Sequence, residues 1–136
     1  MSVAILEAYY DAFNAGDHDA MLALLAEDVV HEPSQGEPRL GKAAFRDFLA
    51  HMDRCYSETV IDPVFLSSPD GARLAAEFHL TGAYRVTDGD LPPANGQRYR
   101  LRVGAFFEVR DGRIGRVSNH YNLADWTAQV SADASD

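Results

Sequence analysis

The stretch that decides the fold runs from Tyr9 to Gly36 and reads YYDAFNAGDHDAMLALLAEDVVHEPSQG. The residues at helical spacing along the apolar face of a first predicted helix are Leu6, Tyr9, Tyr10 and Phe13. Gly16 can adopt the left-handed conformation that ends a helix, and Asp17 can cap the next one. A strand over residues 29–32 is expected to end at Pro33, because proline cannot donate a hydrogen bond to a sheet.

The rest of the chain predicts one long helix and then strands. Residues 42–56 carry apolar side chains at helical spacing, namely Phe45, Phe48, Leu49, Met52 and Tyr56. From residue 57 onward, apolar and polar residues alternate, most clearly over residues 74–86 and 98–109, which predicts half-buried strands. A last strand is expected from Ile114 to Leu123.

Helices followed by alternating strands predict the α+β class. We expect three N-terminal helices packed on a curved, mainly antiparallel sheet, in the shape of a cone. No repeat or linker divides the chain, so a single domain is predicted over residues 1–130. The polar residues 131–136, SADASD, are expected to form a disordered tail.

Length and charge limit the classes of partner. The 136 residues suffice for one core, and the formal net charge of −9 disfavours nucleic acid and anionic membrane surfaces, which would repel the chain. The single Cys55 excludes an internal disulfide and suits a reducing compartment. The N-terminus has no basic segment and no long apolar run, so we predict no signal peptide and no membrane span, and we expect a cytoplasmic location.

Three features together resemble the nuclear transport factor 2-like superfamily, which includes the ketosteroid isomerases and the SnoaL-like polyketide cyclases. They are Tyr9 on the first helix, the Gly16-Asp17 break, and the acidic residue before a proline at Glu32-Pro33. The loop over residues 91–97 and the hairpin after it are also similar to SnoaL-like cyclases. The resemblance implies a cone-shaped barrel that encloses a pocket for a small apolar molecule, no cofactor, and a homodimer formed through the open face of the sheet.

By this resemblance, the expected catalytic residues are Glu32, Tyr9 and Asn119. Glu32 occupies the position of the general base in the isomerases, where a partly desolvated carboxylate can remove a proton next to a carbonyl. The Tyr9 phenol would donate a hydrogen bond to the developing oxyanion. Asn119 stands where the cyclases place an aspartate; its amide can donate or accept a hydrogen bond but cannot act as a base.

Strand alternation allows only one of His31 and Glu32 to face the pocket. We expect Glu32 to share the inner face with Val30, which leaves His31 as the next candidate base. Tyr9 and Tyr10 both lie on the apolar face of the first helix, so either could supply the phenol. The residues expected to contact the substrate are Tyr10, Phe13, His31, Phe107, Tyr121 and Trp126.

Two functions stay open. One is proton transfer of the isomerase or cyclase kind on a small apolar carbonyl compound, with Glu32 as the base. The other is a non-catalytic binding or assembly module of the same fold, because Gly104-Ala105 stands where the isomerases keep a second acid. The histidines show no metal-ligand spacing, and Cys55 is expected to be a buried, inert thiol, so no metal site is predicted.

Overall fold

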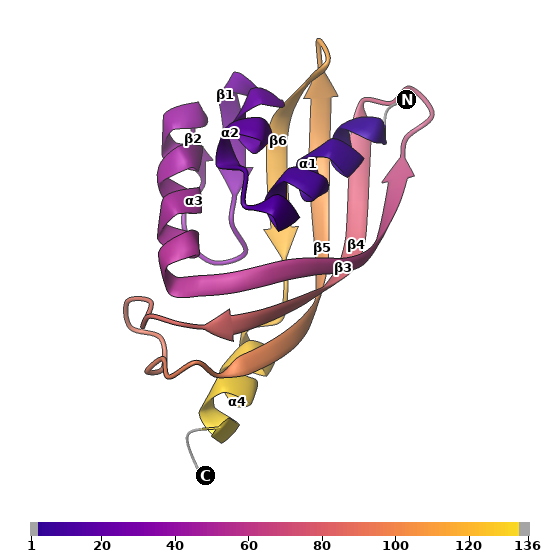
Figure 1. Cartoon of the computed structure of the whole chain (residues 1–136). Helices are drawn as coiled ribbons and strands as arrows, with labels where there is room; N and C mark the ends of the chain where they lie inside the picture. Colours follow the sequence, from indigo (N-terminus) through magenta and orange to yellow (C-terminus); the bar gives the residue numbers. More distant parts are fainter. Residues whose placement is uncertain (1–2, 134–136) are drawn as a thin grey trace.

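The computed structural model describes residues 3–133, in which one sheet carries helices on one face and a further helix at its end (Figure 1). The helices are α1 (Ala4–Ala15), α2 (His18–Ala23), α3 (Lys42–Cys55) and α4 (Leu123–Asp133). The strands are β1 (Leu25–Glu32), β2 (Arg39–Leu40), β3 (Tyr56–Ser67), β4 (Arg73–Tyr84), β5 (Arg98–Arg110) and β6 (Arg113–His120). The predicted α+β class with three N-terminal helices is confirmed.

The sheet of the described residues has the strand order β2-β1-β6-β5-β4-β3. Neighbouring strands are antiparallel except β1 and β6, which run parallel. The sheet is therefore mixed and mainly antiparallel, as predicted. It is open rather than closed into a barrel, because β2 and β3 form its two edges.

An irregularity in β3 contributes to the curvature of the sheet. The pairing of β3 with β4 shifts between Ile61 and Val64. Within this shift Asp62 has a positive φ of 51° and is followed by Pro63. Proline is tolerated in a strand at a bulge or on an edge, and β3 offers both. A bulge of this kind bends the strand, and Figure 1 shows β3 crossing below α1.

The opening stretch folds as its sequence predicts. Gly16 ends α1 with a φ of 70°, and the Asp17 side chain caps α2 by accepting a hydrogen bond from the Ala20 N–H at 3.0 Å. The Asn14 side chain bonds both backbone polar groups of Val60, at 2.8 and 3.0 Å. The end of α1 is thereby fixed to β3, the edge strand.

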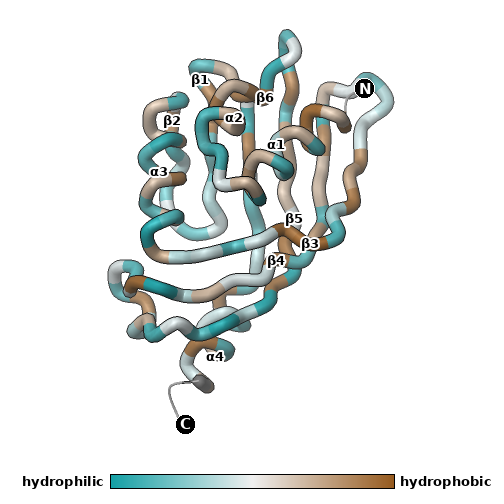
Figure 2. Tube along the Cα trace, viewed as in Figure 1, coloured by the Kyte–Doolittle hydropathy of each residue, from teal (hydrophilic) through white to brown (hydrophobic). Residues whose placement is uncertain are grey.

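The strands divide their side chains between a helix-bearing face and a helix-free face, and hydrophobic residues alternate with hydrophilic ones along them (Figure 2). On β5, the buried residues of the helix-bearing face are Tyr99, Leu101, Val103, Ala105 and Phe107. The intervening Arg98, Arg100, Arg102 and Phe106 are exposed on the other face. This alternation places the core under α1, α2 and α3.

The C-terminal segment differs from the prediction. The last strand ends at His120 instead of Leu123, and residues 131–133, expected in a disordered tail, belong to α4; residues 134–136 lie outside the described part. In α4 the Gln129 side chain bonds the backbone N–H and C=O of Arg100, both at 2.9 Å. The helix thus covers the edge of β5 beyond the end of β6, where no neighbouring strand pairs with Arg100 on that side.

The expected orientation of the β1 side chains is wrong. His31 is buried between the rings of Phe45 and Phe48 on the helix-bearing face, whereas Glu32 points to the helix-free face and pairs with Arg116. The side chains of His31 and Glu32 do point to opposite faces, as strand alternation requires, but each lies on the face predicted for the other. A neutral imidazole costs less to bury than a carboxylate, and Glu32 gains an ion pair outside.

The buried imidazole of His31 predicts a pH dependence of stability. Burial, and secondarily the charge of Arg39, lowers the pKa of His31 from 6.5 to about 4, and its Nδ1 has no hydrogen-bond partner among the described residues. As the pH falls from 6.5 toward 4, the unfolded chain therefore takes up a proton that the folded chain does not. This uptake destabilises the folded state by up to about 3 kcal/mol.

We expect His31→Gln to remove this part of the acid sensitivity. The free energy of unfolding in urea, measured at neutral pH and near pH 4, should fall less on acidification in the variant than in the parent protein. The two proteins are compared by the change in the free energy of unfolding between the two pH values, because the substitution also changes packing. An equal fall in both proteins would contradict the assignment.

Candidate functional site

A carboxylate that the sequence does not single out lies on the helix-bearing face. Glu58 of β3 accepts a hydrogen bond from the Tyr99 hydroxyl at 2.5 Å. The flanking residues of the same face, Tyr56 and Val60, are buried, whereas Glu58 keeps part of its surface accessible. Glu58 is therefore a partly accessible acidic side chain that stands between two buried residues.

The hydrogen bond between Tyr99 and Glu58 crosses the strand that lies between them. Gly82 of β4 pairs with Glu58 on one side and with Tyr99 on the other. A Cβ atom at residue 82 would lie 2.5 Å from the Tyr99 hydroxyl, well inside van der Waals contact. The phenol can reach Glu58 only because residue 82 has no side chain.

This environment changes the acidity of each group. Burial raises the pKa of the Glu58 carboxyl above its ordinary value, and the hydrogen bond from Tyr99 opposes part of the rise. Burial also raises the pKa of Tyr99 and of Tyr121, and the charge of Glu58 adds to both effects. Both phenols therefore stay protonated at neutral pH and can donate hydrogen bonds, while the raised pKa makes Glu58 a stronger proton acceptor than an ordinary carboxylate. We call Glu58, Tyr99 and Tyr121 the Glu58 cluster.

The end of β6 adds a polar side chain on the same face. Asn119 pairs with the buried Ala105 of β5, so it faces the helices, and both Asn119 and Tyr121 are partly exposed. The Ser34 hydroxyl contacts the Tyr121 backbone, accepting from its N–H at 3.3 Å and donating to its C=O at 3.4 Å. The loop after β1 is therefore fixed to the segment that carries Asn119 and Tyr121.

Asp88, in the loop of residues 85–97, forms a second polar group beside the Glu58 cluster. It accepts hydrogen bonds from the Tyr56 hydroxyl at 2.7 Å and from His51 Nε2 at 2.8 Å. Arg54 lies 3.0 Å from His51 Nδ1, and a guanidinium can only donate. His51 Nδ1 is therefore the acceptor, and the ring proton on Nε2 points to Asp88. Burial, and after it the charges of Glu58 and Asp88, raise the pKa of Tyr121.

The same corner brings together ligand atoms that could hold a metal ion. One atom each from His51, Cys55 and Asp88 lies within 4.8 Å of the others. Cys55 is buried and is 4.0 Å from His51 Nε2, between Sγ and the ring nitrogen. The set combines sulfur, nitrogen and oxygen donors, which is a combination that zinc accepts.

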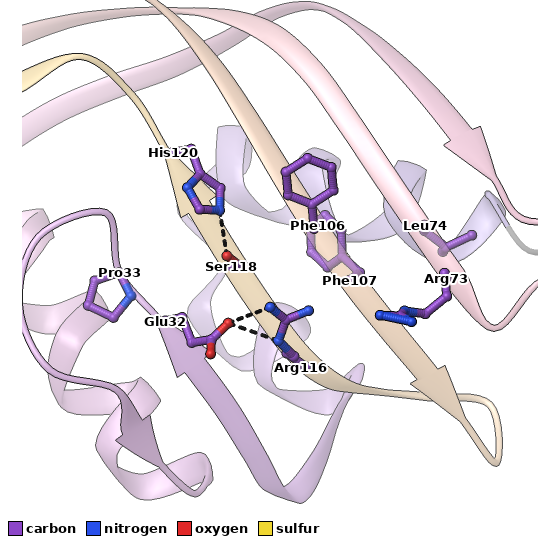
Figure 3. A pocket seen from close by; sticks show the side chains of 9 residues that line it. All are labelled: Glu32, Pro33, Arg73, Leu74, Phe106, Phe107, Arg116, Ser118 and His120. Carbon is purple, nitrogen blue, oxygen red and sulfur yellow. Dashed lines mark hydrogen bonds and ion pairs between the residues drawn. The ribbon is translucent and has the colours of Figure 1, made fainter.

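Glu32, the expected base, lies in a hollow of about 420 Å³ on the helix-free face (Figure 3). Its Oε1 is 2.7 and 2.8 Å from two guanidinium nitrogens of Arg116. In Figure 3 it lies on the same side of the sheet as Ser118 and His120, whose side chains are joined by a 2.6 Å hydrogen bond. Because Asn119 alternates with these residues, Glu32 and Asn119 lie on opposite faces.

Both candidate tyrosines of α1 lie in the core. Tyr9 contacts Phe107 with a ring-centroid distance of 5.6 Å, and Tyr10 stacks on Phe65 at 5.9 Å. Neither hydroxyl forms a hydrogen bond with another described residue, and burial raises the pKa of both phenols. Phe13 is partly buried against the same core. These rings therefore belong to the core on the helix-bearing face.

Trp126 of α4 packs into an aromatic group at the other end. Its ring centroid is 4.9 Å from that of Tyr84, 6.0 Å from Tyr99 and 6.2 Å from Tyr56. Trp126, which was expected to contact the substrate, therefore packs in this structure against Tyr99, the donor to Glu58.

The sequence contains a signal for Glu58, although Glu58 was not among the predicted site residues. Tyr56, Glu58 and Val60 share one face of β3, so an acid stands between two buried residues. Asp88 had no such signal, because its loop has no periodicity. Its partners come from α3 and β3, more than thirty residues earlier in the chain.

The chain is similar in sequence and structure to proteins of one family. The model of a family described as the SnoaL-like domain matches residues 6–117. A candidate polyketide cyclase from Pseudomonas putida is 52% identical, with a TM-score of 0.94 over 96% of this chain and 98% of its own. A second candidate polyketide cyclase, from Xanthomonas campestris, is also 52% identical, with a TM-score of 0.92 over 95% and 96% of the two chains. An LEH-like epoxide hydrolase from M. tuberculosis is 21% identical, with a TM-score of 0.75 over 96% of this chain and 84% of its own, and shares the fold alone.

Proposed function

Because the chain belongs to the SnoaL-like domain family, we propose that it catalyses proton transfer on a small carbonyl compound, as an isomerase or an aldol-type cyclase. The observation that carries this proposal is Glu58, a partly accessible carboxylate of raised pKa that is held by Tyr99 across Gly82. A carboxylate whose pKa is raised accepts a proton more readily than an ordinary one and can return it later in the reaction.

The proposed step is removal of a proton from the carbon next to the carbonyl. The C–H bond breaks, its proton goes to the free carboxylate oxygen of Glu58, and the electron pair moves to the carbonyl oxygen to form an enolate. Tyr121 is the proposed donor to that oxygen, with the Asn119 amide as a second donor. Return of the proton to another carbon gives an isomer, whereas attack of the enolate carbon on a second carbonyl gives a ring.

Glu58 is preferred over Glu32 as the base. The Glu32 carboxylate is paired with Arg116 at 2.7 Å, so its Oε1 is already occupied by a guanidinium. Glu32 also lies on the face opposite Asn119, Tyr9 and Tyr121, so it cannot act on a substrate bound by them. Its position makes Glu32 a matched control for Glu58.

A second candidate function is a non-catalytic binding module. It is favoured by the packing of Tyr9, Tyr10 and Phe107 against one another, because this part of the helix-bearing face is filled by side chains. In that case the Glu58 cluster would only bind a polar group of a ligand.

The test uses exchange of α-protons for deuterium, followed by NMR, over a panel of small ketones and β-dicarbonyl compounds in D₂O. We expect at least one compound to exchange faster with the protein than in buffer. Glu58→Gln should then reduce the rate about 100-fold or more, because the base is lost. Glu32→Gln should retain it within a few-fold, since the site is on the other face.

Two results would count against this assignment. Full exchange by Glu58→Gln would remove Glu58 as the base, and loss of exchange in Glu32→Gln with retained fold would return the role to Glu32. Binding of a panel compound, with no exchange by the parent protein, would favour the non-catalytic module.

We also propose that the protein forms a homodimer through the helix-free face. Leu66 of β3, Ala75 of β4 and Phe106 of β5 are cross-strand neighbours on this face, and Leu66 and Phe106 are 60% and 51% exposed. A continuous apolar row of this kind is typical of an interface.

Sedimentation at micromolar concentration should give twice the mass of the 15.0 kDa chain, and Phe106→Ser should shift the mass toward one chain. A parent protein with the mass of one chain would contradict the proposal.

A further inference from the structure

We propose that His51, Cys55 and Asp88 form a binding site for a divalent transition metal ion, with zinc the best fit. We call these three residues the α3–loop site. The inference goes beyond proton transfer, because the ion would join the 85–97 loop to the end of α3 and take no part in the Glu58 step.

The site is built from two segments that meet only in the folded chain. His51 and Cys55 are four residues apart in the last turns of α3, so their side chains lie on the same side of the helix. Asp88 comes from the loop between β4 and β5 and is already held against them. The two residues of α3 therefore supply two ligands, and the third ligand, Asp88, lies beside them only in the folded chain.

The distances need only small changes to fit an ion. His51 Nε2 is 2.8 Å from Asp88 Oδ1 and 4.0 Å from Cys55 Sγ, and the ligand atoms lie within 4.8 Å of one another. Around a tetrahedral zinc ion, such atoms would be about 3.3 to 3.5 Å apart, given the usual metal–ligand bond lengths. The His51–Asp88 pair would therefore open, and Cys55 Sγ would approach His51 Nε2, by about half an ångström each.

The carboxylate of Asp88 is already oriented for this role. The Tyr56 hydroxyl donates to Oδ2 at 2.7 Å and leaves Oδ1 toward His51 and the ion. Hydrogen bonds of this kind around a metal ligand fix its orientation and tune its affinity. The side chains of His51 and Asp88 are 39% and 23% exposed, so an ion can enter from solvent and keep a water molecule as its fourth ligand.

Binding requires a defined movement of protons. The proton on His51 Nε2 moves to Nδ1, because Nε2 must offer its lone pair to the ion, and Arg54 must leave Nδ1. The Cys55 thiol loses its proton to solvent, since the thiolate is the ligand. One proton is therefore released for each ion bound. Arg54 opposes the ion both as a cation and through its hydrogen bond to Nδ1.

Cobalt titration of the untagged protein gives a direct test, because Co²⁺ replaces Zn²⁺ and Cys55 is the only cysteine of the chain. We expect a sulfur-to-cobalt charge-transfer band that saturates at one ion per chain, disappears on addition of zinc, and is absent in Cys55→Ser. Calorimetry of zinc binding in buffers of different ionisation enthalpy should report release of one proton.

Substitutions distinguish zinc binding at the α3–loop site from zinc binding elsewhere on the surface. His51→Ala and Asp88→Asn should each weaken zinc binding by more than about 10-fold, whereas Arg54→Ala should strengthen it. His79→Ala, on the helix-free face of β4, is the matched control and should leave the affinity unchanged.

The absence of a sulfur–cobalt band at large cobalt excess would overturn the proposal. Zinc affinity that is unchanged in both His51→Ala and Asp88→Asn would overturn it as well. These readouts do not involve turnover, so their failure is independent of the test of Glu58. If Cys55→Ser does not fold, the Asp88→Asn and Arg54→Ala pair decides the question, because the two changes must move the affinity in opposite directions.

Discussion

The hydrogen bond from Tyr99 to Glu58 across Gly82 is the interaction on which the proposed chemistry depends. It requires strands β3, β4 and β5 to be in register, a residue without a side chain on the middle strand, and an aromatic support behind the phenol. Trp126 of α4 contributes to that support. The hydrogen bond from Tyr99 holds the Glu58 carboxylate in a fixed direction without an ion pair, while burial raises its pKa. Glu32, in contrast, is paired with Arg116 on the other face.

The division of the sheet into two faces decides which residues can act together. On the helix-bearing face, the end near α1 is filled by Tyr9, Tyr10 and Phe107, and the end near α4 carries the Glu58 cluster and the Asp88 hydrogen bonds. The helix-free face has the exposed apolar row at Phe106. The proposed ligand site and the proposed dimer interface therefore lie on opposite faces of the sheet.

The sequence predicted the class, the first helices and the break at Gly16-Asp17, because these depend on local spacing and caps. It also identified the superfamily, which the match over residues 6–117 confirms. It failed where the outcome depends on distant residues. The alternation in β1 does not indicate which face of the strand meets α3, so the faces predicted for His31 and Glu32 were the wrong way round. Helix α4 was missed because its place is set by the edge of β5, and Asp88 because its partners lie in α3 and β3.

The most direct test of the account is a titration of the Glu58 side-chain carboxyl by carbon-13 NMR. The account predicts a pKa clearly above the ordinary value of 4.5 in the parent protein. It also predicts a further rise in Tyr99→Phe, because the hydrogen bond that favours the ionised form is lost while the surroundings stay apolar. A pKa at or below 4.5 in the parent protein, or no change in Tyr99→Phe, would contradict it.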